Sequence, residues 1–300
     1  MLGAKVPKPL RDWANARFPA AVAAYRDALL TANQLRTVND RFRSLEQAVH
    51  AKAGSAQTVH TWECSVFSQN GEDGILMNLF GRIGADSCLA VEFGCGNGSE
   101  CNSANLVIGF GWAALLLDAD RSNVDKARRF FDRRLGAAMQ RVTVEEALVT
   151  PENVGELVGR GSSEPDLLSI DIDGNDYWVW SALTDVRPRV VVIEYNASFG
   201  REQAVTVAFD AEFDRYARHP SGYYHGASLE ALRRLGARQG YRLVGCDSAG
   251  VNAFFVRDDI AGDLPRLTSA EAFVPMRERA HVTEVEQFDL IRHLPLVEAQ

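Results

Sequence analysis

Short apolar segments alternate with helix-like segments between residues 60 and 260, and this alternation is the strongest constraint on the fold. Five such segments lie at 88–94, 112–120, 141–149, 166–173 and 189–196, and a hairpin-like pair follows at 241–247 and 251–259. The five are largely apolar throughout, so we expect strands that are buried on both faces. Helices between such strands predict an α/β fold with a doubly wound, mostly parallel sheet, to which the hairpin adds one antiparallel strand.

Composition and charge divide the chain into parts. Of the 300 residues, 46% are hydrophobic and 24% are charged, which is enough for a sizeable globular core. The net charge of −8 argues against nucleic acid as a partner. Residues 1–60 are basic, with nine Lys or Arg against four Asp or Glu, whereas the rest is acidic. We therefore expect a helical extension at 1–57, an α/β domain at 58–260 and a segment at 261–300 packed on that domain.

The N-terminal extension has apolar residues at helical spacing. Between Leu35 and Val49 they recur at intervals of three and four residues, which is a seam of two heptads. Two interpretations are open. The segment is a helical hairpin that packs on its own domain, or it is an arm through which residues 10–50 form a homo-oligomer.

Cysteine usage and hydropathy bear on localisation. The five cysteines include no CxxC pair, which indicates reduced thiols. The N-terminal residues contain no apolar core of a secretory signal, and no apolar run is long enough for a transmembrane segment. The sequence therefore predicts a cytoplasmic protein.

A glycine-rich turn, VEFGCGNGS at 91–99, follows the first strand and precedes a helix. Gly94, Gly96 and Gly98 allow a tight turn and a close approach of the backbone to a ligand. Glu92 precedes them and would crowd a dinucleotide pyrophosphate, but it suits a cationic ligand such as S-adenosylmethionine. Dinucleotide binding and a purely structural turn are the alternatives.

The second strand ends in Asp118, 26 residues after Glu92. A carboxylate at this place can accept hydrogen bonds from both hydroxyl groups of a ribose. The alternative interpretation is a solvated acidic strand end.

These segments together resemble a known family. VEFGCGNG, Asp118, SIDIDGNDYWVWSAL and RPRVVVIEYN resemble the FkbM-type class I S-adenosylmethionine-dependent methyltransferases, in a bacterial branch, over roughly residues 60–260. The resemblance implies an enzyme with a seven-stranded sheet that transfers a methyl group to a hydroxyl of a small molecule, such as a sugar or a secondary metabolite. It also implies that Glu92, the three glycines and Asp118 bind the donor.

The strand order of that family brings an acidic cluster together. Asp171 and Asp173 end the fourth strand, and Glu194 and Asn196 end the fifth. We expect Asp171 and Asp173 at the reaction centre, and Asp171, Glu194 and Asn196 as oxygen ligands of Mg²⁺ or Mn²⁺. A metal would lower the pKa of the acceptor hydroxyl. Alternatively, these acids bind the substrate or the donor directly. Asp176 is expected to cap a helix.

Two further residues are candidates. His225 follows a long segment that would shape the acceptor pocket, where it could act as a general base or make a structural hydrogen bond. Gln69 precedes the first strand and could contact the methionine end of the donor. Two other classes of function stay open: an NAD-type oxidoreductase, and a non-catalytic donor-binding partner of a biosynthetic complex.

Overall fold

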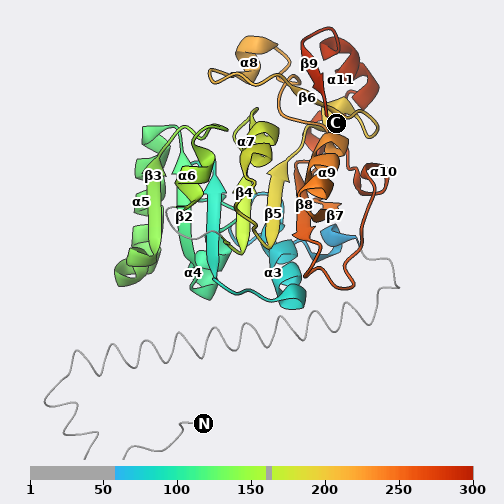
Figure 1. Cartoon of the computed structure of the whole chain (residues 1–300). Helices are drawn as coiled ribbons and strands as arrows, with labels where there is room; N and C mark the ends of the chain where they lie inside the picture. Colours follow the sequence, from blue (N-terminus) through green and yellow to red (C-terminus); the bar gives the residue numbers. More distant parts are fainter. Residues whose placement is uncertain (1–57, 160–163, 300) are drawn as a thin grey trace, which may run out of the picture. The chain divides into compact units, whose positions relative to one another are not determined.

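The computed structural model describes residues 58–159 and 164–299, which belong to one compact unit around a seven-stranded sheet (Figure 1). The strands are β1 (Leu89–Phe93), β2 (Ala113–Asp118), β3 (Val142–Glu146), β4 (Leu167–Ile170), β5 (Val190–Glu194), β7 (Tyr241–Cys246) and β8 (Asn252–Arg257). Their order in the sheet is β3-β2-β1-β4-β5-β8-β7. β1 to β5 are parallel, and β8 is antiparallel to both β5 and β7. The predicted α/β fold with a mostly parallel sheet is confirmed.

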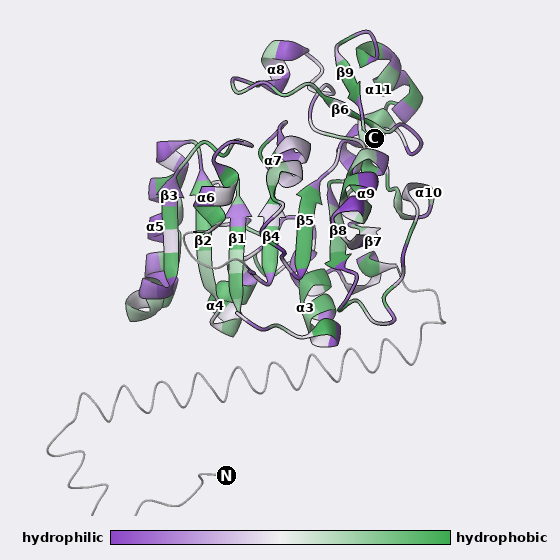
Figure 2. Cartoon of the chain, in the orientation of Figure 1, coloured by the Kyte–Doolittle hydropathy of each residue, from purple (hydrophilic) through white to green (hydrophobic). Residues whose placement is uncertain are grey.

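Helices cover both faces of this sheet. On one face lie α3 (Glu72–Ile83), α4 (Ala104–Phe110) and α5 (Arg121–Leu135), and on the other α6 (Val154–Gly159), α7 (Asp176–Ala182) and α9 (Leu229–Arg238). Side chains of successive strand residues point to opposite faces, and accordingly Ala90 packs with the first group of helices and Val91 with the second. The strands are predominantly hydrophobic in Figure 2. Each face of the sheet therefore has its own core.

A smaller layer follows the carboxyl ends of the parallel strands. It contains β6 (Val205–Val207) and β9 (Leu296–Glu298), which pair antiparallel, with α8 (Arg215–Arg218) and α11 (Glu284–Ile291). The short helix α10 (Ser269–Ala272) lies beside β7 and α9 instead. Four short 3-10 helices complete the described elements: η1 (Val59–Trp62), η2 (Gly136–Arg141), η3 (Ala197–Phe199) and η4 (Arg277–Arg279). Phe199, Val207 and Ile291 share a third hydrophobic cluster. The C-terminal segment thus packs against the segment that follows β5.

Other predictions concern the ends of the chain and its cysteines. The helical extension predicted at 1–57, with its oligomerisation arm, lies outside the described residues. All five cysteines are free. Across the described ranges, no helix combines the length and the apolar character that crossing a membrane requires.

An ion-pair cluster on α9 makes the stability of this fold depend on pH. Glu230 accepts hydrogen bonds from Arg233, Arg234 and Ser269, at 2.7–2.9 Å. Arg233 is the main reason why the pKa of Glu230 falls from 4.5 to about 2. Because the folded-state pKa is depressed, this stabilisation is present above pH 4.5 and disappears as the pH falls towards 2.

We therefore expect Glu230→Gln to lower the free energy of unfolding by about 1 kcal/mol at pH 7. The difference from the unmodified chain should shrink as the pH is lowered from 4.5 towards 2. Urea unfolding at a series of pH values measures it, with the exposed Glu152→Gln as a control. A difference that is constant over pH would show that Glu230 does not act through its charge.

Candidate functional site

The candidate site is a cavity of about 470 Å³ at the carboxyl ends of β1, β2, β4 and β5. Ligands of open α/β sheets bind at this edge. Gly96, Asp118, Asp171 and Glu194 all line it. A second cavity of about 300 Å³ lies beside the first and shares Gly96 and Asp171 with it. The structure therefore brings the predicted donor turn and part of the predicted acidic cluster to one place.

The three glycines of the turn have different roles, although all have positive φ angles of 54–84°. A Cβ on Gly94 would lie 1.7 Å from the backbone oxygen of Asp171, and one on Gly98 would lie 3.1 Å from Ala127 of α5. A Cβ on Gly96 would meet no atom within 4 Å. Gly94 and Gly98 thus permit close packing within the protein. Gly94 and Gly96 both line the two cavities, but of the three glycines only Gly96 has open space where a Cβ would lie.

Glu92 lines the second cavity, but its carboxylate is already engaged with the protein. It accepts hydrogen bonds from the backbone N–H groups of Asn102 and Ser103, at 2.8 and 3.0 Å, and from the Ser103 hydroxyl. Burial raises the pKa of Glu92. These bonds hold the residues before α4 against the end of β1, so that Glu92 shapes the turn.

Asp118 is buried and lines the larger cavity. Its carboxylate accepts hydrogen bonds from the N–H groups of Gly96 and Asp120, at 2.7 and 2.8 Å, and from the side chain of Asn123 at 3.3 Å. It thereby connects the end of β2 to the glycine turn. A carboxylate has about four lone-pair sites, and these three hydrogen bonds use three of them. One site therefore remains for a hydroxyl of a ligand.

Gln69 is exposed and lines both cavities. Its neighbour Asn70 donates hydrogen bonds to Glu72 from its backbone and its side chain, at 2.7 and 3.2 Å. Glu72 also accepts from Asn252 on β8. The loop that carries Gln69 is therefore fixed to the sheet while the Gln69 side chain is available to a ligand.

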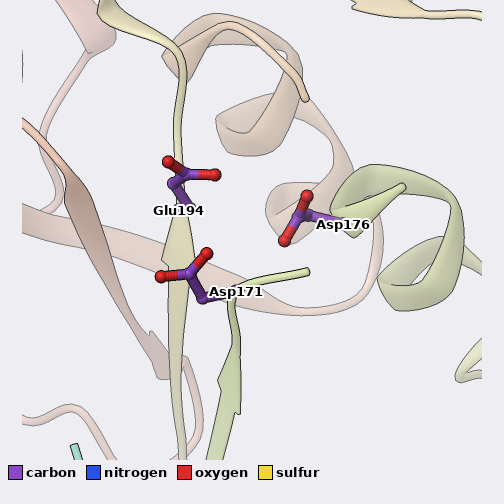
Figure 3. Close-up of side chains that lie close together, drawn as sticks. All are labelled: Asp171, Asp176 and Glu194. Carbon is purple, nitrogen blue, oxygen red and sulfur yellow. The ribbon is translucent and has the colours of Figure 1, made fainter. Parts of the chain in front are cut away.

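Three carboxylates lie close together (Figure 3), and two of them, Asp171 and Glu194, line the larger cavity. One oxygen from each of Asp171, Asp176 and Glu194 lies within 4.8 Å of the other two. Asp171 is exposed to the cavity, whereas Asp176 and Glu194 are buried. Asp176 additionally accepts N–H hydrogen bonds from Ile172 and Gly174, at 2.9 and 3.0 Å. Asp176, which the sequence predicts as a helix cap, thus belongs to the cluster.

The spacing of Asp176 in the sequence indicates its position beside Asp171. Asp176 follows Asp171 by five residues. Within these five residues the chain turns from a strand into a helix and reverses its direction. A side chain at the first position of the helix then faces the end of its own strand, and the two N–H groups that Asp176 binds lie in that turn.

Asp173 and Asn196 lie outside this group of three. Asp173 has a positive φ of 60°, and its largely exposed carboxylate pairs with Arg215 at 2.8 Å. The amide of Asn196 accepts hydrogen bonds from Ser198 and Arg279, and it donates to the carbonyl groups of residues 223 and 225. Since all four hydrogen-bonding positions of this amide are occupied, Asn196 holds the loop after β5 and has no position free for a ligand.

His225 lies behind Glu194, away from the cavity. It is 2% exposed, and its Nε2 lies 3.2 and 3.3 Å from Nη2 of Arg215 and of Arg279. Guanidinium groups only donate, so Nε2 accepts and the proton of a neutral ring lies on Nδ1. Nδ1 lies 3.6 Å from Oε2 of Glu194, and neither atom has a hydrogen-bond partner. Burial and the two guanidinium groups lower the pKa of His225.

The cluster combines carboxylates of different proton affinity. Asp171 opens to the cavity but is otherwise surrounded by protein, and this loss of hydration and the charge of Glu194 raise its pKa well above the usual value. Burial and the charge of Glu194 raise the pKa of Asp176 to about 7. Burial opposes the ionisation of Glu194, but His225, Arg215 and Arg279 together hold its pKa below the usual value. Glu194 is therefore the ionised member, and Asp171 and Asp176 readily take up protons.

No protein-family model and no curated protein matches the sequence. Among solved structures, the chain is similar to a methyltransferase from Galdieria sulphuraria (14% identity, 55% of this chain and 57% of that chain, TM-score 0.36). It is also similar to an O-methyltransferase family protein from Burkholderia thailandensis (12% identity, 62% of this chain and 58% of that chain, TM-score 0.38). A third similar structure is that of magnesium protoporphyrin IX methyltransferase from Synechocystis PCC 6803 with bound S-adenosylmethionine (14% identity, 74% of this chain and 96% of that chain, TM-score 0.42).

The chain thus spans less than three fifths of the first two of these structures, 57% and 58%. The likeness is distant, and it assigns no ligand, substrate or partner to this chain.

Proposed function

We propose that the chain is an S-adenosylmethionine-dependent methyltransferase that methylates an oxygen atom of a small molecule. One observation carries the proposal: Gly96, Asp118, Asp171 and Glu194 open into the same cavity. A donor bound along the glycine turn would place its methyl group towards the acidic cluster. The FkbM-type resemblance of the sequence supports the same reaction, and the sugar or secondary-metabolite acceptor rests on that resemblance alone.

The lining of the cavity suits this donor. Carboxylates of Asp118, Asp171 and Glu194 favour a ligand with positively charged sulfonium and ammonium groups. Ala147 and the exposed Leu148, which follow β3 at the edge of the cavity, offer apolar contact to the adenine ring. Asp118 has a lone-pair site left for a ribose hydroxyl. The same acidic lining disfavours the pyrophosphate of a dinucleotide.

The opposite wall supplies the acceptor side. Phe213 comes from the segment after β6, and Met276 and Arg277 come from the C-terminal segment. An acceptor hydroxyl held between this wall and Asp171 attacks the methyl carbon as the bond from that carbon to sulfur breaks. Asp171, the cluster member exposed to the cavity, accepts the hydroxyl proton. The products are the methyl ether and S-adenosylhomocysteine. His225 acts on Glu194 and does not contact the acceptor in this scheme.

Two of the three predicted metal ligands fit a divalent cation, and the third does not. Asp171 and Glu194 offer free carboxylate oxygens in the cluster, which fit Mg²⁺ or Mn²⁺. Asn196 does not fit, because its amide is fully hydrogen-bonded. A metal held by these carboxylates would supply Lewis acidity that lowers the pKa of the acceptor hydroxyl.

Calorimetric titration of the full chain with S-adenosylhomocysteine tests the donor site. Saturable binding at micromolar concentration is expected, with circular dichroism to confirm that the protein is folded. A parallel titration with NADH should show no heat of binding. NADH binding without S-adenosylhomocysteine binding would favour the oxidoreductase, and donor binding without turnover on any acceptor would favour the non-catalytic partner.

We expect Asp118→Asn to weaken S-adenosylhomocysteine binding by about 1–3 kcal/mol, as for a lost hydrogen bond to a charged group. The matched control is Asp120→Asn, which changes the adjacent carboxylate at the start of α5 outside the cavity lining. Titration calorimetry of both variants measures the difference. Equal affinity of the two variants would remove Asp118 from the donor site.

A further inference from the structure

We propose that the outer face of α5 is a docking surface for an acidic segment of another protein. Lys126, Arg129 and Arg133 follow one another at intervals of three and four residues, and Arg134 adjoins Arg133. These four residues form the basic stripe. Residues at this spacing lie on one face of a helix. The stripe is about 10 Å long, since an α-helix rises about 1.5 Å per residue.

The basic stripe faces away from the sheet. The buried residues of α5 are Val124, Ala127 and Phe131, which lie on the opposite side of the helix, whereas all four members of the stripe are exposed. α5 packs beside β3, the strand at one edge of the sheet (Figure 1). None of the four lines either cavity. A partner bound to the stripe therefore need not enter the candidate site.

The acids of α5 do not neutralise the basic stripe. Asp125 and Asp132 are seven residues apart, so they share another face of the helix. Asp125 pairs there with Arg121 and Arg128, at 3.4 and 3.7 Å. In the part of the chain that the structure describes, no member of the stripe forms an ion pair. The positive charge of the stripe is thus available to a partner, in a chain whose net charge is −8.

Two guanidinium groups of the stripe are already held in place. Nε of Arg133 donates to the carbonyl group of Arg129 at 3.0 Å, and Nη1 of Arg134 donates to that of Phe130 at 3.1 Å. The Arg134 guanidinium also lies over the Phe130 ring, 3.7 Å from its centroid. Most N–H groups of each guanidinium remain for carboxylates. Donors that are fixed before binding lose less conformational entropy when a partner binds.

Stabilisation of the helix accounts for only part of the basic stripe. Basic residues in the last turn interact favourably with the helix dipole, and this effect covers Arg133 and Arg134. Lys126 and Arg129 lie further from the end of α5, where the effect has fallen off. Their position on the same face as Arg133 therefore points to an interaction with another molecule.

The surroundings favour an acidic protein segment over a membrane or a nucleic acid. α5, which is described throughout, exposes no large hydrophobic side chain that could enter a bilayer. Beyond residue 60 the chain is acidic, with 23 Lys or Arg against 36 Asp or Glu. A membrane or a duplex extends well past the stripe and would bring its negative charge close to this acidic body. A short acidic segment contacts the stripe alone.

A decaglutamate labelled with fluorescein is the probe for this surface. Fluorescence anisotropy with the full chain should show saturable binding that weakens as salt is added. The double variant Arg129→Glu/Arg133→Glu should weaken this binding about tenfold or more, because it places like charges opposite each other. The matched control is Arg187→Glu/Arg201→Glu, which reverses two exposed charges outside α5. The control should keep its affinity within about twofold.

Chemical cross-linking locates the bound probe without any variant. A carbodiimide joins carboxylates to amines, and Lys126 is the only lysine between residues 58 and 300. The other three, Lys5, Lys8 and Lys52, belong to the basic N-terminal part. Mass spectrometry of peptides from the cross-linked full chain should find decaglutamate on Lys126. Cross-links on the other three lysines alone would overturn the proposal, because the probe would then dock on residues 1–57.

Equal affinity of the two charge-reversal variants would also overturn the proposal. Circular dichroism shows whether each variant is folded, and the cross-linking result on the unmodified chain does not depend on either. Vesicles of phosphatidylserine and phosphatidylcholine in equal amounts, and a short DNA duplex, test the other classes of partner. Binding of the vesicles or the duplex, without binding of decaglutamate, would exclude an acidic protein segment as the occupant.

Discussion

Replacing Gly94 by alanine is expected to lower the free energy of unfolding by about 3–5 kcal/mol, which is a large effect for a single substitution. The reason is a contact between two backbones. A Cβ at this position would lie 1.7 Å from the oxygen and 2.9 Å from the carbonyl carbon of Asp171. No side-chain rotation can relieve that overlap, so β1 and the end of β4 would have to separate. The positive φ of 76° adds strain of about 1–2 kcal/mol for a residue with a Cβ.

Gly96→Ala is the matched control for this prediction. Gly96 lies in the same turn with a φ of 54°, but a Cβ there meets no atom within 4 Å. It should cost only the backbone strain of about 1–2 kcal/mol. Urea unfolding followed by circular dichroism measures both variants. If the two lose the same stability, the conformation of the turn and not the contact with Asp171 explains the glycine at 94.

The two variants should also differ in ligand binding. Both glycines line the two cavities, but a Cβ at Gly94 would point at the backbone of Asp171, whereas a Cβ at Gly96 would lie in open space and so would occupy ligand space. We expect Gly96→Ala to weaken S-adenosylhomocysteine binding in protein that is still folded. This outcome would show that Gly96 leaves space for the ligand, whereas Gly94 is required for the stability of the fold.

The fold could be predicted because its signal is repeated along the chain. Apolar strands of four to six residues alternate with helices, and only a sheet covered on both faces buries them all. The position of β8 inside the sheet was less accessible to prediction. A hairpin shows that β7 and β8 are neighbours, but the pattern of its residues does not say which of them pairs with β5.

The site was only partly predictable, for a physical reason. Asp118 and Glu194 end their strands, and Asp171 directly follows β4. The carboxyl ends of parallel strands meet at one edge of the sheet, however their side chains are oriented. The orientation of a loop side chain depends instead on local hydrogen bonds. The positive φ of Asp173 and its ion pair with Arg215 direct the Asp173 carboxylate away from the cluster. Hydrogen bonds from two N–H groups direct the Asp176 carboxylate towards it. His225 is buried behind Glu194 by contacts with α8 and η4, which are remote from one another in sequence.

Asp171→Asn is expected to reduce methyl transfer by about 10²–10⁴-fold, the contribution of a positioned proton acceptor. Asp171 is the cluster member exposed to the cavity, and it lines the larger and the smaller cavity alike. Donor affinity should stay within about twofold, because the glycine turn and Asp118 are unchanged. Transfer of a labelled methyl group to an acceptor found by screening measures the first quantity, and calorimetry with S-adenosylhomocysteine measures the second.

The same substitution should not destabilise the protein. Asparagine has the shape of aspartate, and it removes one of three carboxylates that lie within 4.8 Å of one another. In EDTA, where no cation balances these charges, the melting temperature of Asp171→Asn should equal or exceed that of the unmodified chain. A lower melting temperature would mean that Asp171 supports the fold, and retained methyl transfer would remove it from the reaction. A loss of activity combined with equal or greater stability would indicate that Asp171 serves catalysis, although its charge repels the neighbouring carboxylates.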